Sequence, residues 1–432
     1  MTYRAALQFL DSLVDYEKSA KPRDEFKLDN MRRLLDLAGN PQKRLRRTVL
    51  VAGTKGKGSS CYMLEAALRA CGLSTGLFVS PHVLDVRERI QLDGQPVLPQ
   101  LFSRLVERFR PLVRRQPVSY FELTAAMAFD LFARRDVDYA VVEVGLGGRL
   151  DATNLSEPDI SVITRIGLDH IQVLGGTVRK IAREKAGIMR AGRPVVVARQ
   201  QPDAADELAK CARRVGAELV SVAARSRTWD EVAGTDGISF SAFTDLGAGR
   251  FELPLFGRHQ IDNCLTALTV LGRLAQLDSR VQLEPARQGL ARVSIPARCM
   301  IAARRPLTVV DSCHNPDSGE ALAAVIGEHL KSKVVLVYGS LRGKLVKKTI
   351  QPLVPWTELA IVTAPHSPRA MAPDELVRVF RRLGVRVETA VDVGAALTAA
   401  RVAAGTRLPV VVAGSFYLAG EALAVLRRLT RS

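Results

Sequence analysis

The stretch Leu50 to Ser60, LVAGTKGKGSS, is close to a phosphate-binding loop but departs from the usual pattern. In G-x-x-x-x-G-K-[ST], the hydroxyl directly after the lysine holds magnesium. Here Gly58 follows Lys57, so the first hydroxyl comes one position late. Val51 also stands where the pattern has its first glycine. The stretch is a decayed motif, an accident of composition, or a different phosphate-binding loop whose magnesium ligand lies elsewhere.

The segments around this loop favour phosphate binding. TVLVA, Thr48 to Ala52, is a short apolar run rich in β-branched residues, which predicts a buried strand. SCYMLEAALRACG predicts a helix with Ser59 or Ser60 as its N-cap and Gly72 past its end. A glycine-rich loop between a strand and a helix N-terminus attracts phosphate through free amides and the helix dipole. The alternative is a plain βα turn, and the presence of Lys57 weighs against it.

An acidic residue lies at the end of a later strand. DYAVVEVGLGGRLDATN contains a predicted buried strand, Tyr139–Val144, which only Glu143 interrupts. Ligands of open α/β sheets bind beyond the carboxyl ends of the strands. An acidic residue there is a usual ligand of nucleotide-bound magnesium. Because an unpaired buried carboxylate is costly, we favour a metal ligand.

Two further residues are candidates by position. DISVITRIGLDH predicts a strand that ends in Asp169 and His170. A lone histidine at a strand end is more often structural than a ligand, but this strand is the next one after that of Glu143. IAREKAGIMRAG predicts a helix with Lys185 in its interior, where a surface residue or an ion pair with Glu184 is the ordinary interpretation.

The charge of the chain leaves two kinds of partner open. The 432 residues include 62 Lys and Arg against 44 Asp and Glu, a net charge of +18. Nucleic acid is one interpretation, but the basic residues are spread along the chain and aromatic residues, which stack on bases, make up 5%. A diffuse positive field also attracts small anionic substrates. We expect no nucleic-acid partner.

The sequence shows no sign of a membrane or secreted protein. The N-terminal MTYRAALQFLDSLVDYEKSA mixes apolar and acidic residues, which predicts an amphipathic helix and not a signal peptide. No run of about eighteen apolar residues occurs, so we expect no membrane span. The six cysteines form no CxxC pair. They are typical of reduced thiols, and we expect a cytoplasmic protein.

Strands alternate with helices, and the length exceeds one compact core, which predicts two α/β domains. Beyond the elements above, TGLFVS predicts a strand that ends at Ser80, and the segment 226–253 predicts antiparallel strands on the first domain. FKLDNMRRLLDLAGNPQ predicts a helix that Gly39, Asn40 and Pro41 stop. Further predicted helices are QLFSRLVERFRPLVRR, FELTAAMAFDLFARR and HQIDNCLTALTVLGRLA. The runs LTVVD, KVVLVYG, LAIVTA, VRVETA and PVVVAGS predict a second, mostly parallel sheet. We place the boundary within 292–306, giving domains 1–296 and 297–432.

Seven motifs in order resemble one family. They are VAGTKGKGSS, SPHVLDVRERI, YFELTAAMAF, EVGLGGRLDATN, ITRIGLDHIQVLGGTVRKIAREKAGI, GRHQIDNCLTAL and DSCHNP. The set is similar to folylpolyglutamate synthase/dihydrofolate synthase, a branch of the ATP-dependent Mur ligase superfamily. The resemblance runs from about Asn30 to the C-terminus and is densest between Val51 and Ile188. It implies a P-loop-type Mur ligase central domain, followed by a Rossmann-like, mostly parallel α/β domain.

The resemblance also implies a metal site. The family's loop has the form G-T-N-G-K-G-S, so Gly58 belongs to it, and the magnesium ligands fall on Ser80, Glu143 and His170. The histidine is unusual because Mg²⁺ prefers oxygen. The family carries a carbamylated lysine at the position of Lys185, and its added carboxylate would help to hold a second magnesium ion.

Other site residues follow from the resemblance, position by position. The catalytic group comprises Lys57, His170 and Lys185. The ATP-binding group comprises Thr54, Lys55, Gly56, Lys57, Gly58, Ser59, Asn263, Arg298, Asp311 and His314. The segments that match contacts to the pterin-bearing substrate are Ser119, Tyr120, Phe121 and Glu122, and Leu150, Asp151 and Ala152.

The chain departs from the family at three places. Lys55 stands where the family usually has Asn, which adds positive charge beside the phosphates. Cys313 replaces a small Ala in DSCHNP. The segment around Gly343 and Lys344 lacks acidic residues common there, which affects contacts of the C-terminal domain and leaves the ATP site as it is.

The implied activity is ATP-dependent addition of L-glutamate to a folate γ-carboxyl, to dihydropteroate, or to both, by a monomer. The carboxylate would become an acyl phosphate that the amine of glutamate attacks. One alternative is a cell-wall Mur ligase, against which GTKGKGS and GLGGRLDATN argue. Another is a P-loop NTPase coupled to nucleic acid, against which the missing hydroxyl and Lys185 weigh.

Overall fold

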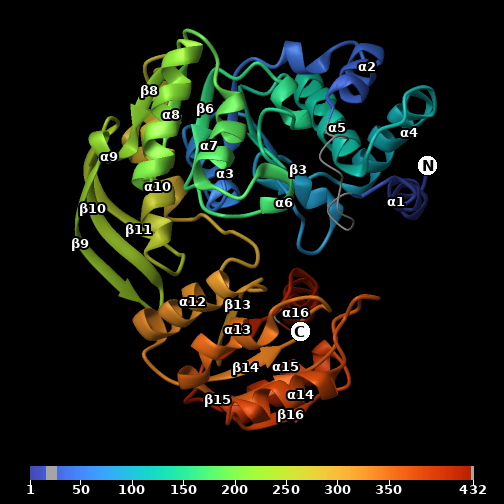
Figure 1. Cartoon of the computed structure of the whole chain (residues 1–432), viewed down its shortest axis with the longest axis vertical. Coiled ribbons are helices and arrows are strands. Elements are labelled where there is room, and N and C mark those ends of the chain that lie inside the picture. The colour runs from blue at the N-terminus through green and yellow to red at the C-terminus, as the bar shows by residue number, and fades with distance from the viewer. Residues whose placement is uncertain (16–26, 430–432) are drawn as a thin grey trace.

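The computed structural model describes residues 1–15 and 27–429 of the chain. Two bodies built on parallel sheets lie one above the other in Figure 1, and a third, antiparallel sheet runs along one side between them. No helix of the described ranges is long and apolar enough to cross a membrane. All six cysteines are free.

The first sheet has eight strands in the order β4-β3-β2-β5-β1-β6-β7-β8. The strands β2, β5, β1, β6, β7 and β8 are parallel to their neighbours, and β3 and β4 form an antiparallel edge. In chain order they are β1 (Thr48–Ala52), β2 (Thr75–Phe78), β3 (Ile90–Leu92), β4 (Gln95–Pro96), β5 (Tyr139–Glu143), β6 (Ile160–Ile163), β7 (Pro194–Val197) and β8 (Glu218–Ser221).

Helices cover both faces of this sheet. Alternate residues of β1 point to opposite cores: Leu50 and Ala52 pack with one set of helices, Val49 and Val51 with the other. The first set is α1 (Tyr3–Asp11), α2 (Asp29–Leu37), α4 (Pro99–Arg115), α5 (Tyr120–Arg135), α6 (Ile171–Leu174), α7 (Val178–Lys185) and α8 (Pro202–Val215). The second is α3 (Lys57–Ala70), α9 (Val222–Arg225), α10 (His259–Leu274) and α11 (Leu283–Leu290). The predicted N-terminal helix is confirmed over α1, and part of that prediction lies outside the described residues.

The segment predicted as antiparallel strands forms a three-stranded sheet. Its strands are β9 (Arg227–Gly234), β10 (Gly237–Thr244) and β11 (Gly247–Leu253), with β10 in the middle. Residues Ile238, Phe240 and Ala242 point inward and share a core with α3, α10 and α11. The sheet therefore belongs to the first body along most of its length.

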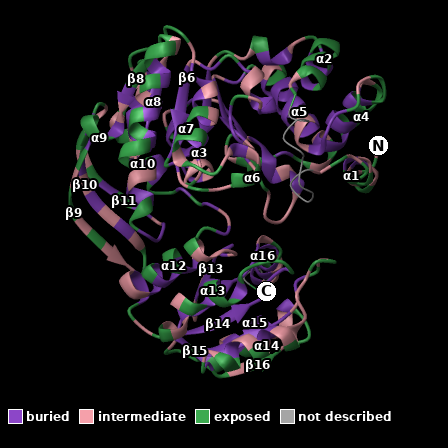
Figure 2. Cartoon of the chain, viewed as in Figure 1, coloured by how far each residue is buried: buried purple, intermediate pink, exposed green. Residues whose placement is uncertain are grey.

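The second body contains a six-stranded sheet in the order β12-β13-β17-β14-β15-β16. The prediction of a mostly parallel sheet is confirmed, with β12 as an antiparallel edge strand. Its strands are β12 (Met300–Arg304), β13 (Leu307–Val310), β14 (Val334–Tyr338), β15 (Thr357–Val362), β16 (Val387–Thr389) and β17 (Val410–Ala413). Its helices are α12 (Pro316–Val325), α13 (Val346–Ile350), α14 (Pro373–Arg382), α15 (Val393–Ala404) and α16 (Phe416–Leu429). In Figure 2 the central strands β13, β17, β14 and β15 are mostly buried, and exposed residues gather on the outer helices.

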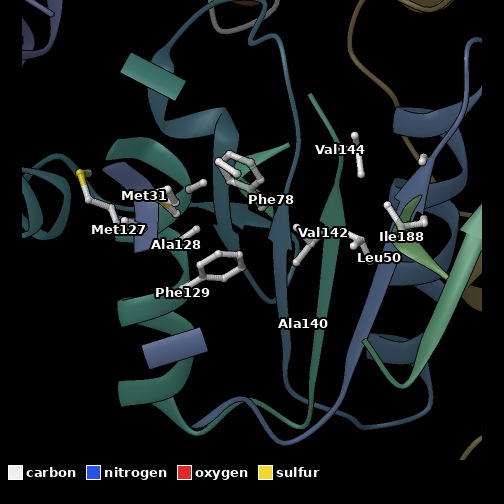
Figure 3. Packing of buried hydrophobic residues seen from close by; sticks show 14 of the residues in the cluster. Met31, Leu50, Phe78, Met127, Ala128, Phe129, Ala140, Val142, Val144 and Ile188 are labelled. Atoms are coloured by element: carbon white, nitrogen blue, oxygen red, sulfur yellow. The ribbon is translucent and has the colours of Figure 1, made fainter. Parts of the chain in front are cut away.

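The core beside α5 fixes the helix whose first turn carries a predicted substrate segment. Phe129 and Met127 of this helix are fully buried, and Phe129 lies beside Phe78 and Val142 of the sheet in Figure 3. The ring of Phe78 also meets that of Phe121 edge-on, with centroids 5.7 Å apart. Packing of α5 on the sheet therefore sets the position of its N-terminal turn.

We predict that Phe129→Ala lowers the free energy of unfolding by about 3–5 kcal/mol, because it empties a fully buried site. Urea denaturation followed by circular dichroism measures the change. Leu98→Ala is the control, since this side chain is 68% exposed, and it should shift stability by less than ~0.5 kcal/mol. An unchanged midpoint for Phe129→Ala would contradict this packing.

Candidate active site

Three neighbouring strands of the first sheet end at the same level. In the register of β1, Val51 lies opposite Glu143 of β5, and Ala52 lies opposite Ile163 of β6. The N–H of Val144 donates to the carbonyl oxygen of Val51 at 2.9 Å, which continues the ladder up to the loop. The glycine-rich loop and the predicted acidic ligand therefore emerge side by side at the carboxyl edge of the sheet, where α/β proteins bind ligands.

The helix after the loop begins earlier than predicted. Its N-cap is Gly56, with left-handed φ of 87°, and the helix starts at Lys57. The prediction of Ser59 or Ser60 as N-cap is wrong, because a glycine in the left-handed region ends the loop before either hydroxyl. As a result, the free N–H groups of the first helical turn belong to the GKGS segment, as an anion site requires.

Glycine is needed at positions 53 and 56 of the loop because other residues approach them closely. A Cβ on Gly53 would lie 1.8 Å from Oγ1 of Thr164, and one on Gly56 would lie 2.2 Å from Oδ1 of Asn263. A Cβ on Gly58 would lie 3.4 Å from Oε2 of Glu143. The predicted nucleotide residue Asn263 and the predicted metal ligand Glu143 thus both lie against the loop.

The start of the loop is tied to the segment after β6. The N–H groups of Thr54 and Lys55 donate to the carbonyl oxygen of Arg165 at 3.0 and 3.1 Å. The hydroxyl of Thr54 donates to the carbonyl oxygen of Gly167 at 3.2 Å. These bonds fix the loop's entry and occupy its first two N–H groups, so a bound anion would meet the amides nearer Lys57.

Glu143 is a buried carboxylate held among cations. Its side chain accepts the N–H of Ser80 at 3.0 Å. Burial raises the pKa of Glu143, while the charge of Lys57, the Ser80 N–H and the charge of Arg298 act in the opposite direction. Ser80 lies two residues past the end of β2 at Phe78, so the predicted strand was too long by two residues.

His170 does not end a strand as predicted. β6 stops at Ile163, and His170 follows an irregular segment with left-handed φ of 47° before the short helix α6. The β-branched Thr164 and Ile166 made the strand look longer than it is. The side chain is 59% exposed and lies 3.8 Å from a carboxylate oxygen of Asp169. No three His, Cys, Asp or Glu side chains within residues 1–15 and 27–429 gather as a metal centre.

Lys185 is buried, and the interpretation as a surface or ion-paired residue is wrong. It is the last residue of α7, not an interior one, and its Nζ donates to the carbonyl oxygen of Gly53 at 2.7 Å. Burial, with a further contribution from Lys57, lowers its pKa to about 7. A Cβ on Gly148 would lie 3.0 Å from the Cα of Lys185, so the GLGG segment also packs here.

In both segments predicted to contact substrate, polar side chains already have hydrogen-bond partners within the chain. Ser119 and Glu122 cap α5 reciprocally, with the Ser119 hydroxyl donating to Glu122 at 2.7 Å. Phe121 packs on the backbone of Gly145, and Tyr120 is buried. In the second segment, the Asp151 carboxylate accepts the Leu146 N–H at 2.9 Å and the Thr153 N–H at 3.0 Å. Leu150 is half-buried and Ala152 is buried.

Residues of the second body form a group at the carboxyl edge of its sheet. Asp311 accepts the N–H groups of Cys299 and Cys313 at 2.8 and 2.7 Å. The guanidinium of Arg298 lies 5.4 Å from the ring centroid of Phe416, and the His314 ring lies 5.6 Å from it. Phe416 was not among the predicted site residues, and no sequence signal marks it.

One ion pair joins this group to the loop. Nζ of Lys55 lies 3.7 Å from a carboxylate oxygen of Asp317, in the first turn of α12. The lysine that departs from the usual Asn thus reaches across to the second body.

A second residue absent from the predictions is Arg89, which is 1% exposed and donates to Nδ1 of His82 at 2.9 Å. Its place in SPHVLDVRERI was the available signal.

Profiles of protein families divide the chain as the two bodies do. The Mur ligase middle domain matches residues 51–271, and the Mur ligase glutamate ligase domain matches residues 298–416. The chain is therefore a Mur ligase by the two family models that match it. Curated relatives narrow the class.

A dihydrofolate synthase/folylpolyglutamate synthase of Mycobacterium tuberculosis is 32% identical over 98% of this chain and 94% of its own length. One of Bacillus subtilis is 33% identical over 76% of this chain and 78% of its own. The chain belongs to the folylpolyglutamate synthase/dihydrofolate synthase family. It spans 50% of the length of a Haloferax volcanii relative, a probable bifunctional folylpolyglutamate synthase/dihydropteroate synthase that is 34% identical over 98% of this chain.

Solved structures agree along the full chain. Folylpolyglutamate synthase of Mycobacterium tuberculosis complexed with ADP has a TM-score of 0.84 at 31% identity, covering 98% of this chain and 99% of that one. The E. coli FolC complex with DHPP and ADP has a TM-score of 0.82 at 28% identity, covering 100% and 99%. The bifunctional enzyme of Yersinia pestis with AMPPNP and Mn ion has a TM-score of 0.82 at 30% identity, covering 99% and 98%.

We predict that Gly56→Ala weakens the affinity of the loop for ADP by about tenfold or more, a loss of about 1.4 kcal/mol, because the new methyl displaces Asn263. Gly72→Ala is a matched control, since Gly72 also has positive φ, 76°, but nothing lies within 4 Å of its added Cβ. Both changes should cost about 1–2 kcal/mol of stability through backbone strain. Isothermal titration calorimetry measures the affinities, and equal ADP binding by the two variants would contradict the close approach.

Proposed function

We propose that this chain is an ATP-dependent amide ligase that adds L-glutamate to the γ-carboxyl of a folate, to dihydropteroate, or to both, and releases ADP and phosphate. The observation that carries the proposal is the juxtaposition of the glycine-rich loop, Asn263 and the buried carboxylate of Glu143 at one sheet edge. The Lys55–Asp317 contact, which brings the second body to the same loop, supports it.

ATP would lie with its phosphates on the amides at the start of α3 and on Lys57. The relatives with bound ADP and AMPPNP support this placement. Arg298, Asp311 and His314 would approach the nucleotide from the second body, and we keep 296/297 as the boundary between the domains. The site is then complete only when both domains face each other.

A divalent metal fits this site through a small number of protein ligands. Glu143 supplies a buried carboxylate against the loop, Ser80 is bonded to it, and His170 would complete the predicted set. Because Mg²⁺ usually takes one or two carboxylates and shares the remaining positions between water and phosphate, the absence of a larger acidic cluster in the described residues is no obstacle. When bound, the ion would offset negative charge on the β- and γ-phosphates.

The chain's own residues would chiefly position the reacting groups and neutralise their negative charge. A carboxylate oxygen of the acceptor attacks the γ-phosphorus of ATP, the bond to ADP breaks, and an acyl phosphate forms. The amine of L-glutamate then attacks the acyl carbon, loses a proton, and expels phosphate. Lys57 would stabilise charge on the transferred group, and closure of the domains would exclude water that competes with the amine.

The acceptor would lie on the first body. The segments Ser119–Glu122 and Leu150–Ala152 flank the GLGG turn, where Phe121 packs on Gly145. A relative in complex with DHPP and ADP supports a pterin-bearing acceptor. We propose a monomer, as the family resemblance implies. The six free cysteines and the use of ATP favour the cytoplasm.

We further propose that Lys185 carries a carbamate. A pKa of about 7 leaves much of this amine neutral near pH 7, and a neutral amine adds CO₂ to form a carbamate with release of a proton. The proximity of Lys57 would stabilise the resulting negative charge.

Incorporation of ¹³CO₂, followed by ¹³C NMR, should rise between pH 6 and pH 8, because the amine of Lys185 deprotonates as the pH passes about 7. Lys185→Arg should abolish the signal, and Lys180→Arg, an exposed residue on the same helix, should leave it unchanged. An identical signal in wild type and Lys185→Arg would contradict carbamylation.

The ligase activity is tested by phosphate release from Mg-ATP with L-glutamate plus either dihydropteroate or tetrahydrofolate. We expect release only when acceptor and glutamate are both present, and a product heavier by one glutamyl unit in mass spectrometry. The two acceptors tested separately show which of the two activities the chain has. Release that needs neither substrate, or that only nucleic acid stimulates, would overturn the proposal.

A further inference from the structure

The three-stranded sheet touches the second body beyond the last turn of α12, whereas the first turn of α12 faces the glycine-rich loop. The β9–β10 end of this sheet reaches the lower body near α12 in Figure 1. We call this contact the hairpin joint; its members are Glu231, Gly234, Asp236, Phe256, Gly257, Arg258, Arg304, Glu328 and His329. The family resemblance implies no role for the hairpin joint, and none of its members is a predicted site residue.

His329 is the buried centre of the hairpin joint. It is 2% exposed and lies in a π-helical turn, Ile326–Leu330, directly after α12. Its Nε2 accepts the N–H of Gly257 at 3.0 Å, so the ring proton is on Nδ1, which donates to the carbonyl oxygen of Gly234 at 2.8 Å. One ring thus joins the hairpin turn, the segment before α10, and the second body. A π-turn is rare and often marks a functional position.

Packing and charge surround this histidine. The ring of His329 stacks on Phe256 at 4.5 Å between centroids. Arg258 pairs with Glu231 of β9 at 2.8 Å and with Glu328 of the π-turn at 3.4 Å. Arg304 of β12 pairs with Asp236 in the hairpin turn. The turn is therefore held from two elements of the second body, β12 and the π-turn.

Helix α12 connects the hairpin joint to the glycine-rich loop. α12 begins at Pro316, capped by Asn315, and its first turn carries Asp317, which lies 3.7 Å from Lys55 of the loop. Its last turn leads directly into His329. A helix is stiff over ten residues, so an orientation fixed at the π-turn is transmitted to the end that faces the loop.

We propose that His329 is a positioning residue for the nucleotide: through its two backbone bonds it uses the antiparallel sheet as a strut that sets α12, and with it His314 and Asp317, against the glycine-rich loop. The kinetic test of this inference rests on the proposed function, because it measures the KM for ATP of the ligase reaction. A displacement of about 1 Å at a reacting group can lower the rate up to about a hundredfold, so a joint remote from the glycine-rich loop can affect catalysis.

The variants His329→Gln, His329→Asn and His329→Ala separate the two bonds. Gln keeps an acceptor near Nε2 for Gly257, Asn keeps a donor near Nδ1 for Gly234, and Ala keeps neither. We expect the KM for ATP to rise about tenfold in His329→Ala and less in the other two, while the KM for the acceptor, which lies on the first body, stays within about twofold. Equal KM values for ATP in all variants, with only a lower melting temperature, would overturn the proposal.

A second readout is independent of activity. Leu98 and Val402 are exposed positions in different bodies. Spin labels on Leu98→Cys and Val402→Cys report the distance between the bodies by electron double resonance. The substitution Cys71→Ser removes the half-exposed native thiol, which would otherwise also be labelled. His329→Ala should broaden the distance distribution and weaken ADP binding. An unchanged distribution would overturn the proposal that the antiparallel sheet acts as a strut. If the wild-type chain lacked ligase activity, the proposed function would fail, but this measurement would still show whether the hairpin joint orients the two bodies.

A surface pair provides the test if His329→Ala does not fold. Arg258→Glu should broaden the distance distribution, and adding Glu328→Arg should narrow it again. Lys333→Glu is the matched control, because Lys333 is 57% exposed against 59% for Arg258 and its partner Glu358 lies within the same body. Equal broadening in Arg258→Glu and Lys333→Glu would contradict a specific role of the joint.

Discussion

The register of β1 between β5 and β6 is the constraint on which the site depends. Because these strands end together, Glu143 and the segment after Ile163 lie beside the glycine-rich loop, with no long side chain needed to reach it. The loop can follow this path only with glycine at the points of closest approach. A one-residue shift would point Glu143 to the other face of the sheet, and the cluster at the loop would be lost.

Several of the basic residues that give the chain its net charge of +18 lie near this edge of the sheet. Lys57 and Arg298 both oppose the rise in the pKa of Glu143 that burial causes. Lys344 of the second body contributes to the lowered pKa of His314, after burial. Such a field attracts a polyphosphate and a polyanionic substrate.

Much of this arrangement was predictable because local chemistry and global position agree. The strand Thr48–Ala52, the loop and Glu143 follow from apolar runs and glycines alone. The start of α3 did not, because Ser59 and Ser60 suit an N-cap by type while the left-handed Gly56 takes that place. The reciprocal cap of Ser119 and Glu122 is local, and its S-x-x-E spacing was available in the sequence. Burial of Lys185 depends on tertiary contacts, which no spacing reveals. The role of Lys55 in contacting Asp317 likewise needed the second body in place.

The most direct test of the account follows one oxygen atom. If the cleft activates a carboxylate as an acyl phosphate, an acceptor labelled with ¹⁸O in its reacting carboxyl must pass one label to the phosphate that leaves. Mass spectrometry of phosphate from a reaction with L-glutamate and Mg-ATP measures the transfer. We predict one ¹⁸O atom in each phosphate released per amide formed. Unlabelled phosphate alongside amide formation would contradict the account, because the carboxylate would not then have attacked ATP.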